Sequence, residues 1–359
     1  MKLKNILIIT GIIVLVYFIF VAGKDTTVIN KPDENAFIAG ANVYYHMDEI
    51  LGQNKAGQLD ALFTRLNKKG IFNGTVLYGE RGKIIYKAAF GYDDFRSKDS
   101  LKMDDAFQLA SVSKMFTAMA IMILKEDGKL EFDDKINRFI PEWPYPDVTI
   151  RQCLTHRSGM SRYMSLADAH WNVNTPINNE EVIDLFVKYI PSPYFKPDDG
   201  FHYCNTNYML LASVVERITG QHFDEFVKEQ IFDPLDMDDS FVYNLRGDTC
   251  INKEIPVGVP GYQSYGRRPA KVGDYYLNGV MGDKGVYSSV EDLFKFNLSF
   301  DEGTLVSMAT LQEGFEPGSP LYYKRKDNYG FGWRLRADMD STAYHFGWWK
   351  GFRTYLCGI

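Results

Sequence analysis

The sequence predicts an α+β protein with an antiparallel sheet flanked by helices and an inserted, mainly helical lobe. Strand-like runs occur near both ends, at 74–87 and 329–357, whereas 130–300 is mainly helical in pattern. Residues 114–124 are apolar on nearly every face, so this helix must be buried in the centre of the domain. These observations place a cleft where the lobe meets the sheet.

The elements follow from local signals. An apolar helical face ends near Gly70, and turns or glycine and proline stops bound the later runs. The expected helices are 59–70, 114–124, 208–219 and 223–231, and the expected strands are 74–78, 83–87, 329–336, 342–349 and 352–357.

The N-terminus predicts export from a bacterial cytoplasm. Lys2 and Lys4 precede an apolar run at 6–22, and small residues at 21–23 offer a cleavage point. The same pattern fits an uncleaved anchor with its lysines inside, so residues 1–23 are either a signal peptide or a signal anchor. Residues 24–55 are predicted to be a tether. We therefore expect a periplasmic or extracellular protein, either soluble or held to the membrane by 6–22.

Composition excludes several function classes. The net charge is −6 and basic residues are scattered among acidic ones, so we expect no nucleic-acid partner. The histidines and cysteines show no metal-ligand spacing, and no cofactor or metal is predicted. The four cysteines are expected to be buried free thiols. They are Cys153, Cys204, Cys250 and Cys357.

The first chemical candidate is Ser111-Val-Ser-Lys114. Positions i and i+3 share a helix face, so the lysine can reach the serine hydroxyl. Burial disfavours the charged form of an amine, which favours a lysine that accepts the serine proton. Serine and lysine at this spacing also occur by chance, at solvated helix starts. A lysine in the first turn of an apolar helix, however, needs a partner.

Two further candidates lie downstream. Tyr203-Cys-Asn205 could supply a proton shuttle and an amide ligand, although a helix-capping loop is the simpler interpretation of either residue. His345-Phe-Gly347 lies in a predicted strand, where a glycine often marks close approach of a ligand. A bulge with an exposed histidine would explain it equally well in isolation.

The ordered set resembles the signature elements of class C β-lactamases and low-molecular-weight penicillin-binding proteins. Similar segments are FQLASVSK at 107–114, LTHRSG at 154–159, NTNYMLL at 205–211 and GDKGVYSSVEDL at 282–293. The resemblance covers 56–359 and implies a β-lactamase/transpeptidase-like hydrolase domain. The family normally continues past the position of Ile359 through another strand and a C-terminal helix, so we expect this domain to be C-terminally incomplete.

The resemblance also implies roles for individual residues. Ser111 would attack a carbonyl, while Lys114 and Tyr203 would shuttle its proton. His156, in LTHRSG, corresponds to a structural segment and is left out of the catalytic set.

The remaining implied roles concern substrate binding. Asn205 would hold the substrate amide, and His345 with Gly347 would line the site. The backbone N–H groups of Ser111 and Trp348 would form the oxyanion hole.

The expected function is therefore an acyl-enzyme serine hydrolase acting on D-amino-acid peptides, possible cell-wall peptides among them, β-lactams or small esters. Histidine in the third motif resembles the peptidase, esterase and β-lactamase-like branch. Peptidase or esterase activity is favoured over a true β-lactamase, because deacylation of a penicilloyl enzyme depends on a water geometry that no motif reports. The alternative is a non-catalytic, membrane-tethered penicillin-binding or sensing module that keeps the fold. Covalent labelling of Ser111 followed by turnover discriminates the two.

Overall fold

The computed structural model describes residues 52–245, 258–265, 268–320, 327–336 and 342–358. Residues from Gln53 to Ile359 group into one unit. The predicted export segment, nearly all of the tether and Cys250 lie outside the described residues, so those predictions stay untested.

The N-terminal part of this unit is a helix and a hairpin. The helix covers 52–68 and so begins seven residues before its expected start, within the last residues of the predicted tether. The hairpin pairs β1 (Gly74–Glu80) with β2 (Lys83–Phe90). Both strands extend two or three residues beyond their predicted ends. The hairpin packs on α8 (Val290–Glu302): a Cβ atom at Gly79 would lie 2.4 Å from the Phe294 ring, so a larger residue there would have to displace this ring.

The C-terminal strands form a four-stranded antiparallel sheet in the order β10, β11, β12, β13. The expected strand over 329–336 is broken into two, because Gly330 and Gly332 turn the chain between them. A Cβ atom at Gly330 would lie 2.2 Å from the Gly314 carbonyl oxygen, and Gly332 has φ +84°. The strands are β10 (Asp327–Tyr329), β11 (Arg334–Arg336), β12 (Thr342–Trp349) and β13 (Phe352–Gly358).

Contrary to expectation, the described strands near the two ends of the sequence do not belong to one sheet. Within the described residues, β1 pairs only with β2, and β13 pairs only with β12. Short ladders make up the remaining strands. They are β3 (Tyr92–Asp94), β4 (Asp99–Ser100), β5 (Phe107–Gln108), β6 (Phe241–Val242), β7 (Tyr262–Tyr265), β8 (Arg268–Lys271) and β9 (Val286–Ser288).

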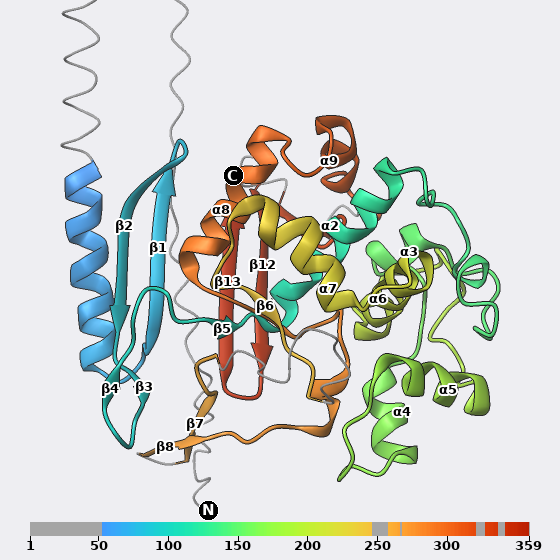
Figure 1. Cartoon of the computed structure of the whole chain (residues 1–359), viewed down its shortest axis with the longest axis horizontal. Helices are drawn as coiled ribbons and strands as arrows, with labels where there is room; N and C mark the ends of the chain where they lie inside the picture. Colours follow the sequence, from blue (N-terminus) through green and yellow to red (C-terminus); the bar gives the residue numbers. More distant parts are fainter. Residues whose placement is uncertain (1–51, 246–257, 266–267, 321–326, 337–341, 359) are drawn as a thin grey trace, which may run out of the picture. The chain divides into compact units, whose positions relative to one another are not determined.

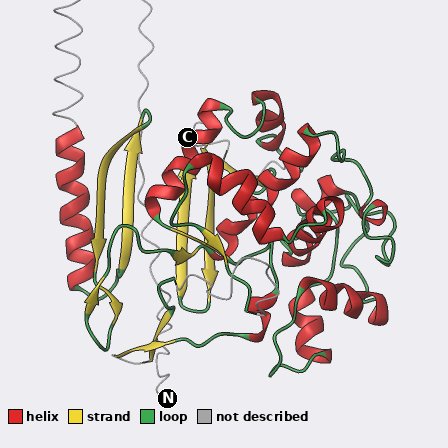
Figure 2. Cartoon of the chain, in the orientation of Figure 1, coloured by secondary structure: helices red, strands yellow, loops and turns green. Residues whose placement is uncertain are grey.

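Helices surround α2 and form the predicted lobe. In Figure 1 the hairpin β1–β2 and helices α3 to α6 lie on opposite sides of β12 and β13, and Figure 2 shows how helical the lobe is. The helices are α2 (Ser113–Glu126), α3 (Ile150–Leu154), α4 (Tyr163–His170), α5 (Asn179–Tyr189), α6 (Asn205–Thr219), α7 (Phe223–Val227), α8 and α9 (Met308–Gly314). Short turns of other helix types are η1 (Ala110–Val112), η2 (Ile136–Arg138), η3 (Lys228–Phe232), η4 (Asp233–Leu235) and η5 (Tyr276–Gly279).

Burial of α2 agrees with its sequence. All side chains from Ser113 to Leu124 are buried, and α6 packs beside it as a second central helix. Helix α6 ends at Gly220, whose φ of +72° suits a glycine cap. The expected helix over 223–231 instead changes to a π-helical turn after Val227.

The cysteine prediction is confirmed in part. Cys153 and Cys204 are free and buried, whereas Cys357 is free but exposed, because it lies on the outer strand β13. Among the helices of the described residues, none combines the length and apolar character of a membrane span.

One acidic side chain in the lobe predicts a measurable pH dependence. Glu216, on α6, accepts a hydrogen bond from the Phe223 N–H (3.0 Å), and burial raises its pKa from 4.5 to about 7. Between these values the folded state holds a proton that the unfolded state has lost, so stability from this group falls as pH rises from 4.5 through 7.

Glu216→Gln should therefore raise the free energy of unfolding at pH 8 by on the order of 2–3 kcal/mol, with little change near pH 4.5. Urea melts at the two pH values measure it. A gain of equal size at both would contradict the burial argument.

Candidate active site

The candidate nucleophile lies at the entry to α2. Ser111 is the middle residue of η1, which leads directly into α2, and its side chain is partly exposed. The residue before it, Ala110, has φ +50°, a left-handed conformation that costs energy outside glycine. Such strain persists only where the surrounding structure enforces it. The strained residue directly precedes the partly exposed Ser111.

Lys114 is completely buried one turn later. Its Nζ atom lies 3.2 Å from Ser111 Oγ and donates a hydrogen bond to the Asp283 carbonyl oxygen (2.7 Å). The ring faces of Tyr203 and Tyr208 lie 5.1 and 5.7 Å from the same nitrogen. The predicted Ser–Lys contact is therefore present, and the lysine has the partner that its burial demands.

A loop from the far part of the chain fixes this first turn. Thr117 Oγ1 donates to the Gly282 carbonyl oxygen (2.7 Å), and the Val286 N–H donates to Ser113 Oγ (3.1 Å). The Leu109 N–H in turn donates to the Val286 carbonyl oxygen (2.8 Å). Segment 282–286, identified in the sequence by resemblance, is thus the support of the Ser–Lys pair.

The second motif enters the site from the start of α6. Tyr203 precedes the helix and Asn205 is its first residue, so the sequence expectation of a helix starting at Tyr208 was one turn late. Tyr203 Oη and Asn205 Oδ1 are both buried and have no hydrogen-bond partner in the described part of the chain. Buried polar atoms are nearly always paired, so these two unpaired atoms need an explanation beyond the packing of the described chain.

His345 lies behind the tyrosine. Its ring is fully buried, with its centroid 6.1 Å from that of Tyr203. Nδ1 is 2.9 Å from the Phe346 carbonyl oxygen, which can only accept, so Nδ1 carries the proton and Nε2 accepts from the Tyr329 hydroxyl (3.0 Å). Burial, with Lys114 and Arg334 nearby, holds the pKa of His345 well below its usual value. Both ring nitrogens of this neutral histidine are engaged by the protein.

Gly347 brings β12 against the nucleophile. A Cβ atom there would lie 2.2 Å from the Leu109 carbonyl oxygen and 3.0 Å from the Ser111 nitrogen. No other residue permits such contact, so the strand and η1 meet backbone to backbone.

The backbone N–H of Trp348 lies on the same strand edge. Lys350 and Gly351 have φ +35° and +97°, as a two-residue type I′ turn requires, so the flanking Trp349–Phe352 pair is hydrogen-bonded. Bonding direction alternates along a strand, and the Trp348 N–H therefore points away from β13. Strand β11 pairs with β12 only as far as Tyr344, so no strand of the described chain covers this N–H.

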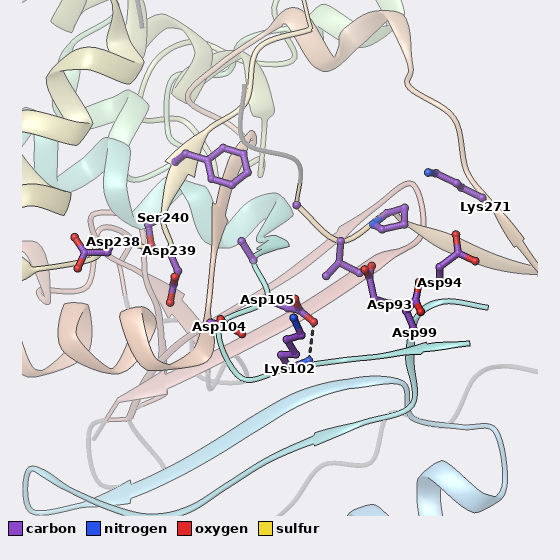
Figure 3. A pocket seen from close by; sticks show the side chains of 15 residues that line it. Asp93, Asp94, Asp99, Lys102, Asp104, Asp105, Asp238, Asp239, Ser240 and Lys271 are labelled. Carbon is purple, nitrogen blue, oxygen red and sulfur yellow. Dashed lines mark hydrogen bonds between the residues drawn. The ribbon is translucent and has the colours of Figure 1, made fainter. Parts of the chain in front are cut away.

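An acidic pocket of about 580 Å³ lies elsewhere and shares no lining residue with this site. Figure 3 shows carboxylates from the β3–β5 region facing those near β6, with Lys102 donating its backbone N–H to Asp105. The described residues contain no group of three or more His, Cys, Asp or Glu side chains placed to hold a metal ion. The labelled lining residues are Asp93, Asp94, Asp99, Lys102, Asp104, Asp105, Asp238, Asp239, Ser240 and Lys271.

Comparison with known proteins places the chain. The β-lactamase family model matches residues 59–359. The chain belongs to the β-lactamase family. A penicillin-binding protein of Bacillus subtilis is 36% identical over 316 residues, which cover 85% of this chain and 69% of the relative. At this level it is a serine hydrolase related to penicillin-binding proteins, and the predicted family and fold class are confirmed.

More distant relatives and structural neighbours include hydrolases with other names. A D-aminopeptidase of Cereibacter sphaeroides is 25% identical over 82% of this chain, which spans only 55% of that protein. A penicillin-binding protein from Bacillus halodurans superposes with a TM-score of 0.71 at 24% identity, over 82% of this chain and 89% of its own. EstCE1, a hydrolase with promiscuous acyltransferase activity, gives 0.71 at 18% identity, over 85% and 91%. The similarity to these two solved structures, at 24% and 18% identity, supports the fold and not a particular activity.

The structure links Ser111, Lys114, Tyr203, His345 and Gly347 around the start of α2, whereas Asn205 begins α6 next to Tyr203. Sequence reasoning missed the Asp283 carbonyl oxygen on Lys114, the Tyr329 hydroxyl on His345, and Arg334, whose guanidinium lies 5.2 Å from the Tyr203 ring centre. No motif indicates them, because backbone acceptors carry no residue signature and Arg334 reaches the site only through strand pairing.

The backbone contact at Gly347 makes a clear prediction. Gly347→Ala must push β12 away from Leu109, and we expect a loss of about 2–3 kcal/mol in the free energy of unfolding together with loss of hydrolysis. Gly57→Ala is the matched control, since its Cβ meets open space within the helix over 52–68 and should leave stability equal or higher. Denaturant melts and ester hydrolysis measure both, and a Gly347→Ala variant with wild-type stability would contradict the contact.

Proposed function

We propose that the protein is an exported serine hydrolase that forms an acyl-enzyme on Ser111 and acts on D-amino-acid peptides. The observation that carries this proposal is the Ser111–Lys114 pair, in which a partly exposed hydroxyl lies 3.2 Å from a fully buried amine. A serine hydroxyl becomes a useful nucleophile only beside such a base. The sequence of 1–23 supports export, as a cleaved signal or an anchor.

The reaction follows from the positions of these groups. Ser111 Oγ attacks the substrate carbonyl carbon while its proton passes to Lys114 Nζ. The carbonyl oxygen gains the negative charge and is bound by the N–H groups of Ser111 and Trp348. When the tetrahedral intermediate collapses, Tyr203 gives a proton to the leaving amine and recovers one from Lys114. The products of this half are the free amine and an ester on Ser111.

Hydrolysis reverses the same relay. Water takes the place of the amine, loses a proton to the Tyr203–Lys114 pair, and attacks the ester carbonyl. Ser111 Oγ leaves and regains a proton, and the acid is released. Asn205, with its free Oδ1, holds the substrate amide N–H, while His345 and Gly347 form the wall behind Tyr203 and beside Ser111.

A cation beside Tyr203 supports an anionic substrate. The Arg334 guanidinium lies 5.2 Å from the Tyr203 ring centre, and the described residues give it no carboxylate partner. A peptide carboxylate or the carboxylate of a penicillin fits this cation, whereas a small neutral ester uses only the Ser–Lys centre. The D-aminopeptidase relative is consistent with a peptide substrate.

The test is mass spectrometry of the full chain after exposure to benzylpenicillin and to p-nitrophenyl acetate. We expect one adduct from each reagent on Ser111, absent in Ser111→Ala and present in the control Ser97→Ala, whose serine lies in an exposed turn. Loss of the adduct with time measures turnover. Folded wild-type protein that takes no adduct contradicts the proposal, and a stable adduct with no turnover of ester or D-alanyl peptide points to the non-catalytic penicillin-binding alternative.

A further inference from the structure

His156 is a buried residue that packs on Tyr203 and that the proposed reaction does not use. It follows α3 and has φ +59°, a left-handed conformation unusual for a residue with a Cβ atom. Its side chain is completely buried. Strain and burial of a polar ring together indicate that surrounding contacts require this residue in this place.

Those contacts converge on three consecutive residues. The His202 N–H donates to the His156 carbonyl oxygen (3.0 Å), and the Cys204 N–H donates to His156 Nδ1 (3.2 Å). Between them, the Tyr203 ring packs on the imidazole with 4.3 Å between centroids. One residue therefore holds the backbone on both sides of Tyr203 as well as its ring.

A buried network fixes the protonation of the imidazole. Asn207 Nδ2 lies 3.1 Å from Nδ1, and Ser158 Oγ donates to Asn207 Oδ1 (2.5 Å), which sets the orientation of that amide. Nδ1 thus accepts from two N–H donors and carries no proton. Burial, with Lys114, His345, Arg334 and His202 around the ring, holds the pKa of His156 well below its ordinary value. The acceptor at Nδ1 is therefore permanent, and His156 is not a proton carrier.

Tyr203 depends on these contacts to its ring and backbone, because no hydrogen bond from the described residues holds its hydroxyl. Within the described residues Tyr203 Oη has no hydrogen-bond partner, so the ring must be oriented from its face and its backbone. Lys114 and Arg334 approach the ring at 5.1 and 5.2 Å, and neither binds the backbone of 202–204. His156 is the residue that does both.

We propose that His156 is a positioning residue that sets the hydroxyl of Tyr203 for proton transfer between Lys114 and the substrate. The inference rests on the proposed function, because it assigns His156 to the same relay. It predicts that losing the imidazole costs the enzyme only what Tyr203 contributes.

The test is a double-mutant cycle on the acylation rate of Ser111. His156→Leu removes the acceptor at similar bulk, whereas His156→Asn keeps an acceptor oxygen and tolerates positive φ. We expect His156→Leu to slow acylation about 10- to 100-fold, less than the roughly 100- to 10,000-fold of a complete general acid–base contribution, because Tyr203 is displaced and not removed. His156→Asn should recover most of the rate. In a Tyr203→Phe background, His156→Leu should add less than about twofold.

A general loss of packing would behave differently. Thr310→Val removes a part-buried hydrogen bond to Glu126, at the opposite end of α2 from Lys114, and serves as the control for lowered stability. An equal fold-loss from His156→Leu with and without Tyr203, or no loss at all, overturns the proposal. So does a His156→Asn variant as slow as His156→Leu at matched thermal stability.

A second readout separates this proposal from the proposed function. The ¹³Cζ signal of Tyr203, identified by its disappearance in Tyr203→Phe, reports ring order without any substrate. If wild-type protein takes no adduct, the hydrolase proposal fails on its own. Positioning is then supported by a shifted and broadened signal in His156→Leu that returns in His156→Asn, and it is overturned by a signal unchanged in both.

Discussion

The contact between Lys114 Nζ and the Asp283 carbonyl oxygen organises the site. A lysine inside an apolar helix is costly unless its amine is bonded, and this acceptor comes from a loop 169 residues further along the chain. Holding it in place requires the other bonds between the 282–286 segment and the first turn of α2. When α2 is buried against the 282–286 segment, the Lys114 amine is therefore fixed beside Ser111.

The opposite wall is set by close backbone packing. Strand β12 can approach η1 only at Gly347, and that approach brings the Trp348 N–H to the strand edge beside Ser111. Tyr203 completes the third side, with His345 and His156 behind it as neutral rings. Their neutrality follows from burial near Lys114 and Arg334, since a further positive charge there would be unfavourable. The two histidines therefore add no charge of their own beside the Ser111–Lys114 pair.

Sequence reasoning recovered the parts encoded by local spacing. Ser111 and Lys114 share one helical turn, and the apolar run behind them identifies a buried helix, so their contact was predictable. The order of the motifs and their resemblance to a known family predicted the other site residues, since no local physical signal identified them. They are Tyr203, Asn205, His345 and Gly347. The proton positions on His345 and the clamp at His156 were not predictable, because both depend on tertiary partners such as Tyr329 and the Cys204 N–H. The sequence also could not predict that the hairpin β1–β2 and the strands β10 to β13 belong to separate sheets, because strand pairing depends on tertiary contacts.

The most direct measurement is the rate constant for labelling of Ser111 by a fluorophosphonate in wild-type protein and in Lys114→Met, which keeps the length of the side chain and removes its amine. The account predicts that labelling slows by at least about 100-fold in a protein that still folds but is less stable, because the buried Asp283 carbonyl oxygen loses its partner. Equal labelling rates in two folded proteins would show that the Ser111 hydroxyl does not depend on Lys114, and would contradict the account.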